Sequence, residues 1–231
     1  MGRPAIEPAS SDPAARAGGA PALSGRADAN PPGLGFWALV AEDRRTQEHG
    51  LGSQGFWALL VHRFGNRRMG LPKALRVPAT LLYRVAYKLV QVLCGIDLPY
   101  PVRVGRRVRL EHFGGMILVA EAIGDDVTIR QNTTFGIKRV AGEHLRPTIG
   151  DGVDVGVGAV IIGGVTVGAG ATVGANAVVI KDVPPGAVAV GVPARVIGQA
   201  RGEAPDHAPG HAPDHAPGHA RGDASLTRGG S

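Results

Sequence analysis

Aliphatic side chains recur at every sixth position between residues 149 and 184 of this chain. The residue that follows each of them is usually glycine, and Ile162 and Ile180 are the exceptions. A six-residue period matches neither the 3.6-residue turn of a helix nor the alternation of a flat strand. It predicts a coil of short strands joined by tight bends, which glycine permits. The aliphatic positions, which would share one interior, are Ile149, Val155, Ile161, Val167, Val173 and Val179.

A transmembrane helix is the competing interpretation of the same region. Residues 155–180 carry no charge over 26 positions, and about 20 apolar residues suffice to span a bilayer. Seven of these 26 residues are glycine, however, and few are large and apolar. The strict six-residue register therefore favours the coil.

The coil is expected to begin near Val102 and to run to Pro184. If three six-residue steps complete one turn, this length allows four to five turns. Residues 113–122 shift the register by one position, and the charged and polar residues 138–147 interrupt it, as a loop projecting from one corner would. Prolines near the end are expected to help close the stack, because a terminal coil otherwise exposes a strand edge. They are Pro184, Pro185 and Pro193.

Two similar segments precede the coil, GFWALV at 35–40 and GFWALL at 55–60. Each is expected to open a short amphipathic helix, and Gly50, Gly52 and Ser53 mark a turn between them. The twin tryptophans of these segments, Trp37 and Trp57, have two interpretations. We favour helix–helix core, and a binding surface is the alternative.

A third helix is predicted over about residues 79–93. Pro78 is expected to start or kink it, and Gly95 to end it. Arg84 and Lys88 would face water. The apolar face at helical spacing would consist of Leu82, Val85, Ala86, Leu89 and Leu93.

Three stretches resemble the serine O-acetyltransferases, within the superfamily of hexapeptide-repeat acyltransferases. They are GFWALLVHR at 55–63, GIDLPYPVRVGRRVRLEHFGG at 95–115 and VPPGAVAVGVPARVIG at 183–198. The similarity covers about residues 36–198. It implies a left-handed parallel β-helix with three hexads per coil, preceded by a small helical region in which His62 and Arg63 have a structural role. The expected organisation is a disordered segment at 1–34, a helical region at 35–96, the β-helix at 97–198 and a low-complexity tail at 199–231.

The resemblance also implies the catalytic pair. Transfer of an acetyl group from a thioester to a hydroxyl needs a base, a group that orients the base, and donors for the oxyanion. Histidine is the natural base, since its pKa lies near working pH. In serine acetyltransferases an Asp and a His fifteen residues apart form the pair, and Asp97 and His112 have this separation. His112 would deprotonate the acceptor hydroxyl, and the carboxylate of Asp97 would hold the imidazole in its proton-accepting tautomer.

Three departures from the family pattern leave the acceptor open. The family continues from the Asp with Ile-His-Pro, whereas Asp97 is followed by Leu-Pro-Tyr. The residue before the catalytic His is commonly Asp and is Glu111 here. A substrate-binding His precedes a Pro on the projecting loop of the family, whereas Arg146 takes that place here, with His144 two residues earlier. Arginine can still hold a carboxylate with two hydrogen bonds.

Acetyl-CoA is the donor that the resemblance implies, bound as a co-substrate with no tightly bound cofactor. In the family it lies in a groove between the coils of a trimer and is held by backbone amides. Lys181 and Arg195 would meet CoA phosphates. The matching groove positions are Thr134, Gly136, Gly156, Gly158, Ala159 and Gly174. A homotrimer or a dimer of trimers is therefore expected.

Composition adds a few bounds. A net charge of +6 and a pI near 10.1 fit an anionic ligand, a nucleic acid or an anionic membrane surface, and no nucleic-acid motif is present. The single cysteine excludes a disulfide framework, and no signal peptide is evident, so a cytoplasmic location is expected. We expect no metal site in the folded part. Four histidines spaced four apart lie in the tail, where metal binding and an inert tail are both open. They are His207, His211, His215 and His219.

Three functions remain at this point. The first is a serine O-acetyltransferase that feeds cysteine synthesis. The second is an O-acetyltransferase acting on a sugar or polysaccharide precursor. The third is a non-catalytic trimeric β-helix scaffold, for which replacing His112 would change nothing except stability.

Overall fold

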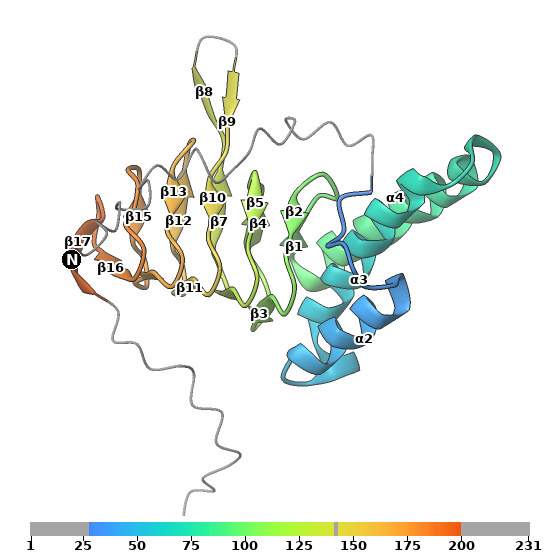
Figure 1. Ribbon diagram of the computed structural model, residues 1–231, viewed down its shortest axis with the longest axis horizontal. Helices are drawn as coiled ribbons and strands as arrows, with labels where there is room; N and C mark the ends of the chain where they lie inside the picture. Colours follow the sequence, from blue (N-terminus) through green and yellow to red (C-terminus); the bar gives the residue numbers. More distant parts are fainter. Residues whose placement is uncertain (1–27, 141–142, 200–231) are drawn as a thin grey trace, which may run out of the picture. The chain divides into compact units, whose positions relative to one another are not determined.

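The structure is a computed structural model of the 231-residue chain, and it describes residues 28–140 and 143–199. These residues belong to one compact unit that ends at Arg201. Most of the expected N-terminal segment and the histidine-rich tail lie outside the described residues. Helices come first and stacked strands follow (Figure 1). The helices are α2 (Phe36–Thr46), η1 (Gly50–Gly52), α3 (Gln54–Arg67), η2 (Arg68–Gly70) and α4 (Lys73–Cys94).

The strands form three parallel sheets, one for each side of the coil, which we call faces A, B and C. Face A contains β1 (Ile96–Asp97), β4 (Met116–Leu118), β7 (Thr134–Gly136), β12 (Val160–Ile162) and β15 (Val178–Val179). Face B contains β2 (Arg103–Val104), β5 (Ala122–Ile123), β10 (Thr148–Ile149) and β13 (Thr166–Val167). Face C contains β3 (Arg109–Glu111), β6 (Thr128–Arg130), β11 (Asp154–Val155), β14 (Thr172–Val173), β16 (Ala187–Val190) and β17 (Arg195–Gln199). The chain passes the faces in the repeating order B, C, A, which makes a β-helix of about five turns.

The six-residue pattern sets the register of this stack. Val155 pairs with Val173, and Ile161 with Val179, each 18 residues further along the chain. These aliphatic side chains are almost completely buried, so the interior is a column of Val and Ile, as predicted. The fold is the left-handed parallel β-helix that the sequence analysis expected.

Departures from the 18-residue turn lie where the sequence loses its period. Val104 pairs with Ile123, 19 residues later, which confirms the one-residue shift. Phe135 pairs with Ile161, 26 residues later. The additional eight residues contain the antiparallel hairpin of β8 (Lys138–Val140) and β9 (Glu143–Leu145), which projects from the stack (Figure 1).

On face C, the strands at both ends of the stack have additional hydrogen-bond partners. At the last turn, β17 pairs with β16 in the antiparallel direction. At the first turn, the side-chain amide of Gln47 donates to the carbonyl of Val108 and accepts from the amide of Leu110, at 2.8 and 3.2 Å. A covered edge cannot recruit a strand from another chain, and this protects a repeat fold from aggregation.

The third helix differs from the prediction at its start. It begins at Lys73, and Pro78 lies inside it, in the second turn. A proline this close to the start removes only one intrahelical hydrogen bond, so the helix continues through it. The predicted end is confirmed, because Gly95 has a left-handed backbone conformation with φ of 63°. In the described part of the chain, no helix has the length and apolarity needed to cross a bilayer.

The predicted apolar face of α4 does not face the protein core. Tyr83, Val90 and Cys94 are the buried side chains of this helix, whereas Leu89 and Leu93 are more than half exposed. The core interpretation of the twin tryptophans is also wrong, since Trp37 is 78% and Trp57 45% exposed. Tertiary contacts select the helix face that is buried, and the short first coil offers too little surface to cover the rest.

Arg63 and His62 on α3 connect the helices to the first coil. The guanidinium of Arg63 is fully buried and meets the carboxylate of Asp43 at 3.0 Å. It also donates to the carbonyls of Val104 and Gly105, at 2.7 and 2.6 Å. His62 hydrogen-bonds to the carbonyl of Val102 at 2.9 Å. The structural role expected for this pair is therefore confirmed.

His62 should make stability depend on pH. Burial, followed by the charge of Arg63, lowers its pKa to about 3, whereas an unfolded histidine has a pKa of about 6.5. Between these values the unfolded chain binds the additional proton, so stability is complete above pH 6.5 and falls as the pH falls. The slope is at most about 1.4 kcal/mol per pH unit. Chemical denaturation between pH 4 and 7 should show this slope in the wild type and lose it in His62→Gln. Equal slopes in both proteins would contradict the assignment.

Candidate active site

The corner between faces C and A carries His112 and several of the predicted CoA-binding residues. We call this corner the C–A edge, and on successive turns it consists of residues 112–115, 131–133, 156–159 and 174–177. His112, Gly156, Gly158 and Gly174 therefore lie along one edge of the β-helix. The sequence period alone places them there, since they follow strands of the same face.

The backbone at His112 departs from the regular corner. Ile96 pairs with Met116, 20 residues later, so this turn holds two residues more than the regular turns. His112, Gly114 and Gly115 have φ of 61°, 98° and 65°, in the left-handed region where glycine is common and histidine is tolerated. The additional residues bulge outward, which leaves His112 and Phe113 exposed to solvent.

Asp97 lies in strand β1 of face A, on the turn next to the one that carries His112. A Cβ added to Gly95 would lie 2.9 Å from the Cα of Gly114, so the turns touch there without side chains between them. Asp97 follows Gly95 by two residues, and His112 precedes Gly114 by two. Among the described residues, however, no hydrogen bond or ion pair joins Asp97 to His112. The structure brings the pair to adjacent turns without direct contact.

Two residues of α4 hold the carboxylate of Asp97. The hydroxyl of Tyr87 donates to Oδ1, and the side-chain amide of Gln91 donates to the same oxygen at 3.2 Å. Burial and the neighbouring carboxylate raise the pKa of Tyr87, so its hydroxyl stays protonated and remains a donor. The sequence analysis missed both residues. Their spacing of four on a helix that ends just before Asp97 is the signal that could have revealed them.

Glu111 is fixed by a ladder of charges on the outer surface of face C. Its carboxylate meets the guanidinium of Arg130 on the next turn at 3.2 Å. Arg130 in turn pairs with Asp154 one turn further along. Glu111, next to His112 in the chain, is therefore held by an ion pair, and Arg130 is a third residue that the sequence analysis missed.

Arg146 and His144 lie at a different edge. Both belong to the chain segment that connects β7 on face A to β10 on face B, so their corner is the A–B edge. His144 is exposed on β9 opposite Arg139, and the Nε of Arg146 is buried without a hydrogen-bond partner in the described residues. A single chain therefore does not bring these residues to His112.

Five of the six backbone amides expected to hold CoA donate hydrogen bonds within the stack of this single chain. The amides of Gly156, Gly158 and Gly174 donate to carbonyls of Val173, Gln131 and Ala189, at 2.7–3.0 Å. Those of Thr134 and Ala159 donate to Ala159 and Gly156, and the Ala159 side chain is fully buried. The parallel register that makes the coil uses these donors. The glycines leave the C–A edge without side chains, so a ligand could approach the backbone closely there.

The remaining predicted CoA residues are dispersed. Gly136 lies at the end of β7 beside Ile162. Lys181 is exposed after β15, at the A–B edge, and Arg195 is exposed on β17 at the end of the stack. Neither cation shares the C–A edge with His112 in one chain.

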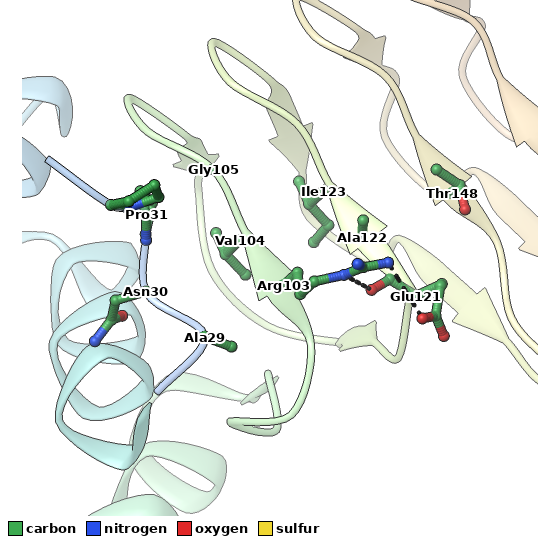
Figure 2. Close-up of a pocket in the computed structure, with 11 residues that line it drawn as sticks. Ala29, Asn30, Pro31, Arg103, Val104, Gly105, Glu121, Ala122, Ile123 and Thr148 are labelled. Carbon is green, nitrogen blue, oxygen red and sulfur yellow. Dashed lines mark hydrogen bonds and ion pairs between the residues drawn. The ribbon is translucent and has the colours of Figure 1, made fainter. Parts of the chain in front are cut away.

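A separate cavity of about 610 Å³ lies on face B, on the side of the coil opposite the C–A edge (Figure 2). It is bounded by residues 29–32 and by strands β2, β5 and β10. Its charged side chains, Arg103 and Glu121, pair with each other at 3.2 Å. Residues 28–140 and 143–199 contain no cluster of three or more His, Cys, Asp or Glu that could hold a metal.

No protein-family model matches the chain. A serine acetyltransferase of Mycobacterium tuberculosis is 43% identical over 124 residues, which are 53% of this chain and 54% of the relative. The chain thus spans about half the length of that curated relative.

Solved structures agree with this relative. The soybean serine acetyltransferase apoenzyme is 31% identical with a TM-score of 0.59, covering 70% of this chain and 69% of that one. A serine acetyltransferase of Vibrio cholerae is 28% identical with a TM-score of 0.60, covering 72% and 67%. Sequence and fold agree over the helices and the β-helix, and the chain belongs to the serine acetyltransferase family.

Proposed function

We propose that this protein transfers the acetyl group of acetyl-CoA to the hydroxyl of L-serine, a step that supplies cysteine synthesis. The observation that carries the proposal is that an exposed His112, at the glycine-rich C–A edge, and a fixed Asp97, in β1 of face A, lie on adjacent turns. Family members support the choice of ligands, since solved serine acetyltransferases are complexes with CoA and with serine. The free, buried Cys94 is consistent with a cytoplasmic location.

The chemistry follows from the groups at this edge. His112 takes the proton of the acceptor hydroxyl as its oxygen attacks the thioester carbonyl carbon. The tetrahedral intermediate then collapses, the carbon–sulfur bond breaks, and the CoA thiolate leaves and takes the proton from the imidazolium. In the reacting complex the carboxylate of Asp97 orients the imidazole of His112, and Tyr87 and Gln91 keep that carboxylate in place. The glycine edge lets pantetheine approach the backbone.

The site is completed by a neighbouring chain in a homotrimer. The outer surface of face A is mostly apolar, with Ile117, Val160 and Val178 in one row and Ile162 and Ile180 in the next. Packing this surface around a threefold axis places the C–A edge of one chain against the A–B edge of the next. The projecting hairpin, with Arg146 and His144, then reaches His112 of its neighbour. Sedimentation of a monomer at assay concentrations would contradict this arrangement, and Ile117→Arg should disrupt the trimer.

A sugar hydroxyl is the second candidate acceptor. Glu111, which would be Asp in the family pattern, is engaged with Arg130, and Arg146 stands where the family has histidine. Both changes concern the residues assigned to the acceptor, whereas Asp97 and His112 are retained. Arg146 still offers a carboxylate two parallel hydrogen bonds, and for this reason we retain serine as the first choice.

Steady-state release of CoA thiol distinguishes the two acceptors. We expect turnover with acetyl-CoA and L-serine at millimolar concentration, and none with D-serine or with sugars and their nucleotide derivatives. Product mass spectrometry should show one acetyl group on serine for each thiol released. Turnover with a sugar alone would favour the second candidate, and no turnover with any hydroxyl compound would favour the scaffold.

A further inference from the structure

The helices carry an exposed apolar surface that the proposed reaction does not use. A groove of about 870 Å³ between α2, α3 and α4 is lined by Trp37, Trp57, Phe64 and other apolar side chains. The outward side of α4 continues this surface, and seven of its large apolar side chains are 52–71% exposed. We call these side chains the α4 outer face, and they are Leu75, Leu81, Leu82, Val85, Leu89, Val92 and Leu93. Contiguous apolar surface of this kind marks an interaction site in soluble proteins.

The same region is strongly basic. Residues 49–96 contain seven Lys or Arg and no Asp or Glu. Arg63 is used by Asp43, and Arg68 lies over the rings of Tyr83 and Tyr100. The remaining cations of α3 and α4 include four exposed side chains without an ion pair in the described residues. They are Arg67, Lys73, Arg84 and Lys88.

The positive charge of this region distinguishes between two possible binding partners of the surface, a second copy of the chain and an anionic lipid bilayer. A second copy of the chain, docked face to face about a twofold axis, would set the acid-free α4 of one copy against the acid-free α4 of the other. Like charges facing each other in an interface cost several kcal/mol. An anionic lipid surface presents the opposite sign and also accepts the apolar side chains. A helix with an apolar face, a basic flank and nearby tryptophans is typical of proteins that lie in the membrane interface.

We propose that α4 and the twin tryptophans dock this protein on the surface of an anionic lipid bilayer. Leu82, Leu89 and Leu93 enter the region between headgroups and acyl chains, with Trp37 and Trp57 beside them at the headgroup level. Arg84 and Lys88 extend to the lipid phosphates, with their methylene stems lying along apolar surface. The helix lies in the plane of the interface and does not cross it. In the proposed trimer, three copies of the helix would strengthen binding by avidity.

Flotation of the full-length protein with lipid vesicles tests this proposal, and it does not depend on enzymatic activity. The expected result is binding to phosphatidylcholine vesicles that contain phosphatidylglycerol, and much weaker binding to phosphatidylcholine alone. High salt should weaken the binding by screening. The two tryptophans are the only ones in the chain, so their emission should shift to the blue when vesicles are added.

Two double variants separate the contributions. Arg84→Gln/Lys88→Gln should weaken binding to the anionic vesicles by about 30-fold, at about five-fold for each cation near the surface. Leu81→Gln/Val92→Gln should weaken it by about 10-fold or more through lost apolar burial. Both pairs are exposed, so folding should be unaffected, as circular dichroism would verify. The matched control is Lys138→Gln/Arg139→Gln on the hairpin, which removes the same charge and should bind like the wild type.

Three outcomes would overturn the proposal. The first is failure of the wild type to float with anionic vesicles. The second is equal loss of binding in the hairpin control, which would show that net charge alone is responsible. The third is a fall in oligomer mass in Leu81→Gln/Val92→Gln by light scattering with vesicle binding unchanged, which would assign the α4 outer face to a second copy of the chain.

Discussion

Replacing His112 with alanine should lower kcat/KM for acetyl transfer by about 100-fold or more, because general-base catalysis contributes about this much. His112 is exposed at the C–A edge, and its side chain makes no hydrogen bond or ion pair within the described residues, so its loss removes little folded-state packing. The thermal unfolding midpoint should therefore change little compared with the rate. The measurement is thiol release at saturating and at limiting acceptor, with the unfolding midpoint recorded for each protein.

The matched control for His112 is His49→Ala. His49 is also exposed, but it lies between α2 and η1 and has no place in the proposed site. Its replacement should leave the rate unchanged. If both variants retain wild-type activity, His112 is not the base, and the scaffold hypothesis gains support. If thermal stability and rate fall together, the loss reflects folding.

Replacing Arg63 with methionine should lower the free energy of unfolding by about 3–5 kcal/mol, the cost of removing one partner of a buried ion pair. The change leaves the buried carboxylate of Asp43 without its cation and two carbonyls without a donor. Burial already raises the pKa of Asp43, and Arg63 is the group that opposes this rise. Urea denaturation at pH 7 measures the loss.

Arg67→Met is the control for that prediction. Arg67 lies one helical turn beyond Arg63 on α3 and is exposed, so its loss should cost less than about 0.5 kcal/mol. Replacing both members of the pair, as Arg63→Met/Asp43→Leu, should recover part of the stability because no buried charge is left alone. Equal effects of Arg63→Met and Arg67→Met would show that the buried pair does not connect the helices to the coil.

The β-helix could be predicted because aliphatic residues recur at every sixth position of the sequence. Each hexad places one aliphatic residue inward, and the pairing of Val155 with Val173 follows from the count alone. A projecting loop at 138–147 was predicted for the same reason, as charged residues cannot continue the buried column, but the pairing of β8 with β9 was not predicted. The edge that carries His112 and the glycines also follows from the period, since every residue after a face C strand falls on it.

The helical region was predicted less well. Periodicity identified an apolar side of α4 correctly, but it could not show which side the coil would cover. Tyr83 and Val90 face the core, and Leu89 and Leu93 do not. The placement of the twin tryptophans failed for the same reason. A helix that is apolar over most of its circumference gives no sequence signal for the side that is buried.

The candidate site was predicted in its residues but not in its contacts. Spacing and resemblance identified Asp97 and His112, whereas Tyr87 and Gln91 became visible only when α4 was placed against β1. The period could not show that five of the six backbone amides assigned to CoA donate hydrogen bonds within the coil. Arg146 lies at the A–B edge, away from His112. The sequence of a single chain does not show which edges of neighbouring chains come into contact.

The central claim is that Asp97 and His112 act together on the acceptor hydroxyl. A double-mutant cycle tests it most directly, with kcat/KM measured for Asp97→Asn, His112→Ala and the double variant, using acetyl-CoA and L-serine. If the carboxylate works through the imidazole, each single change lowers the rate, and the double variant is no slower than His112→Ala. Losses that multiply in the double variant, or full activity in Asp97→Asn, would contradict the claim.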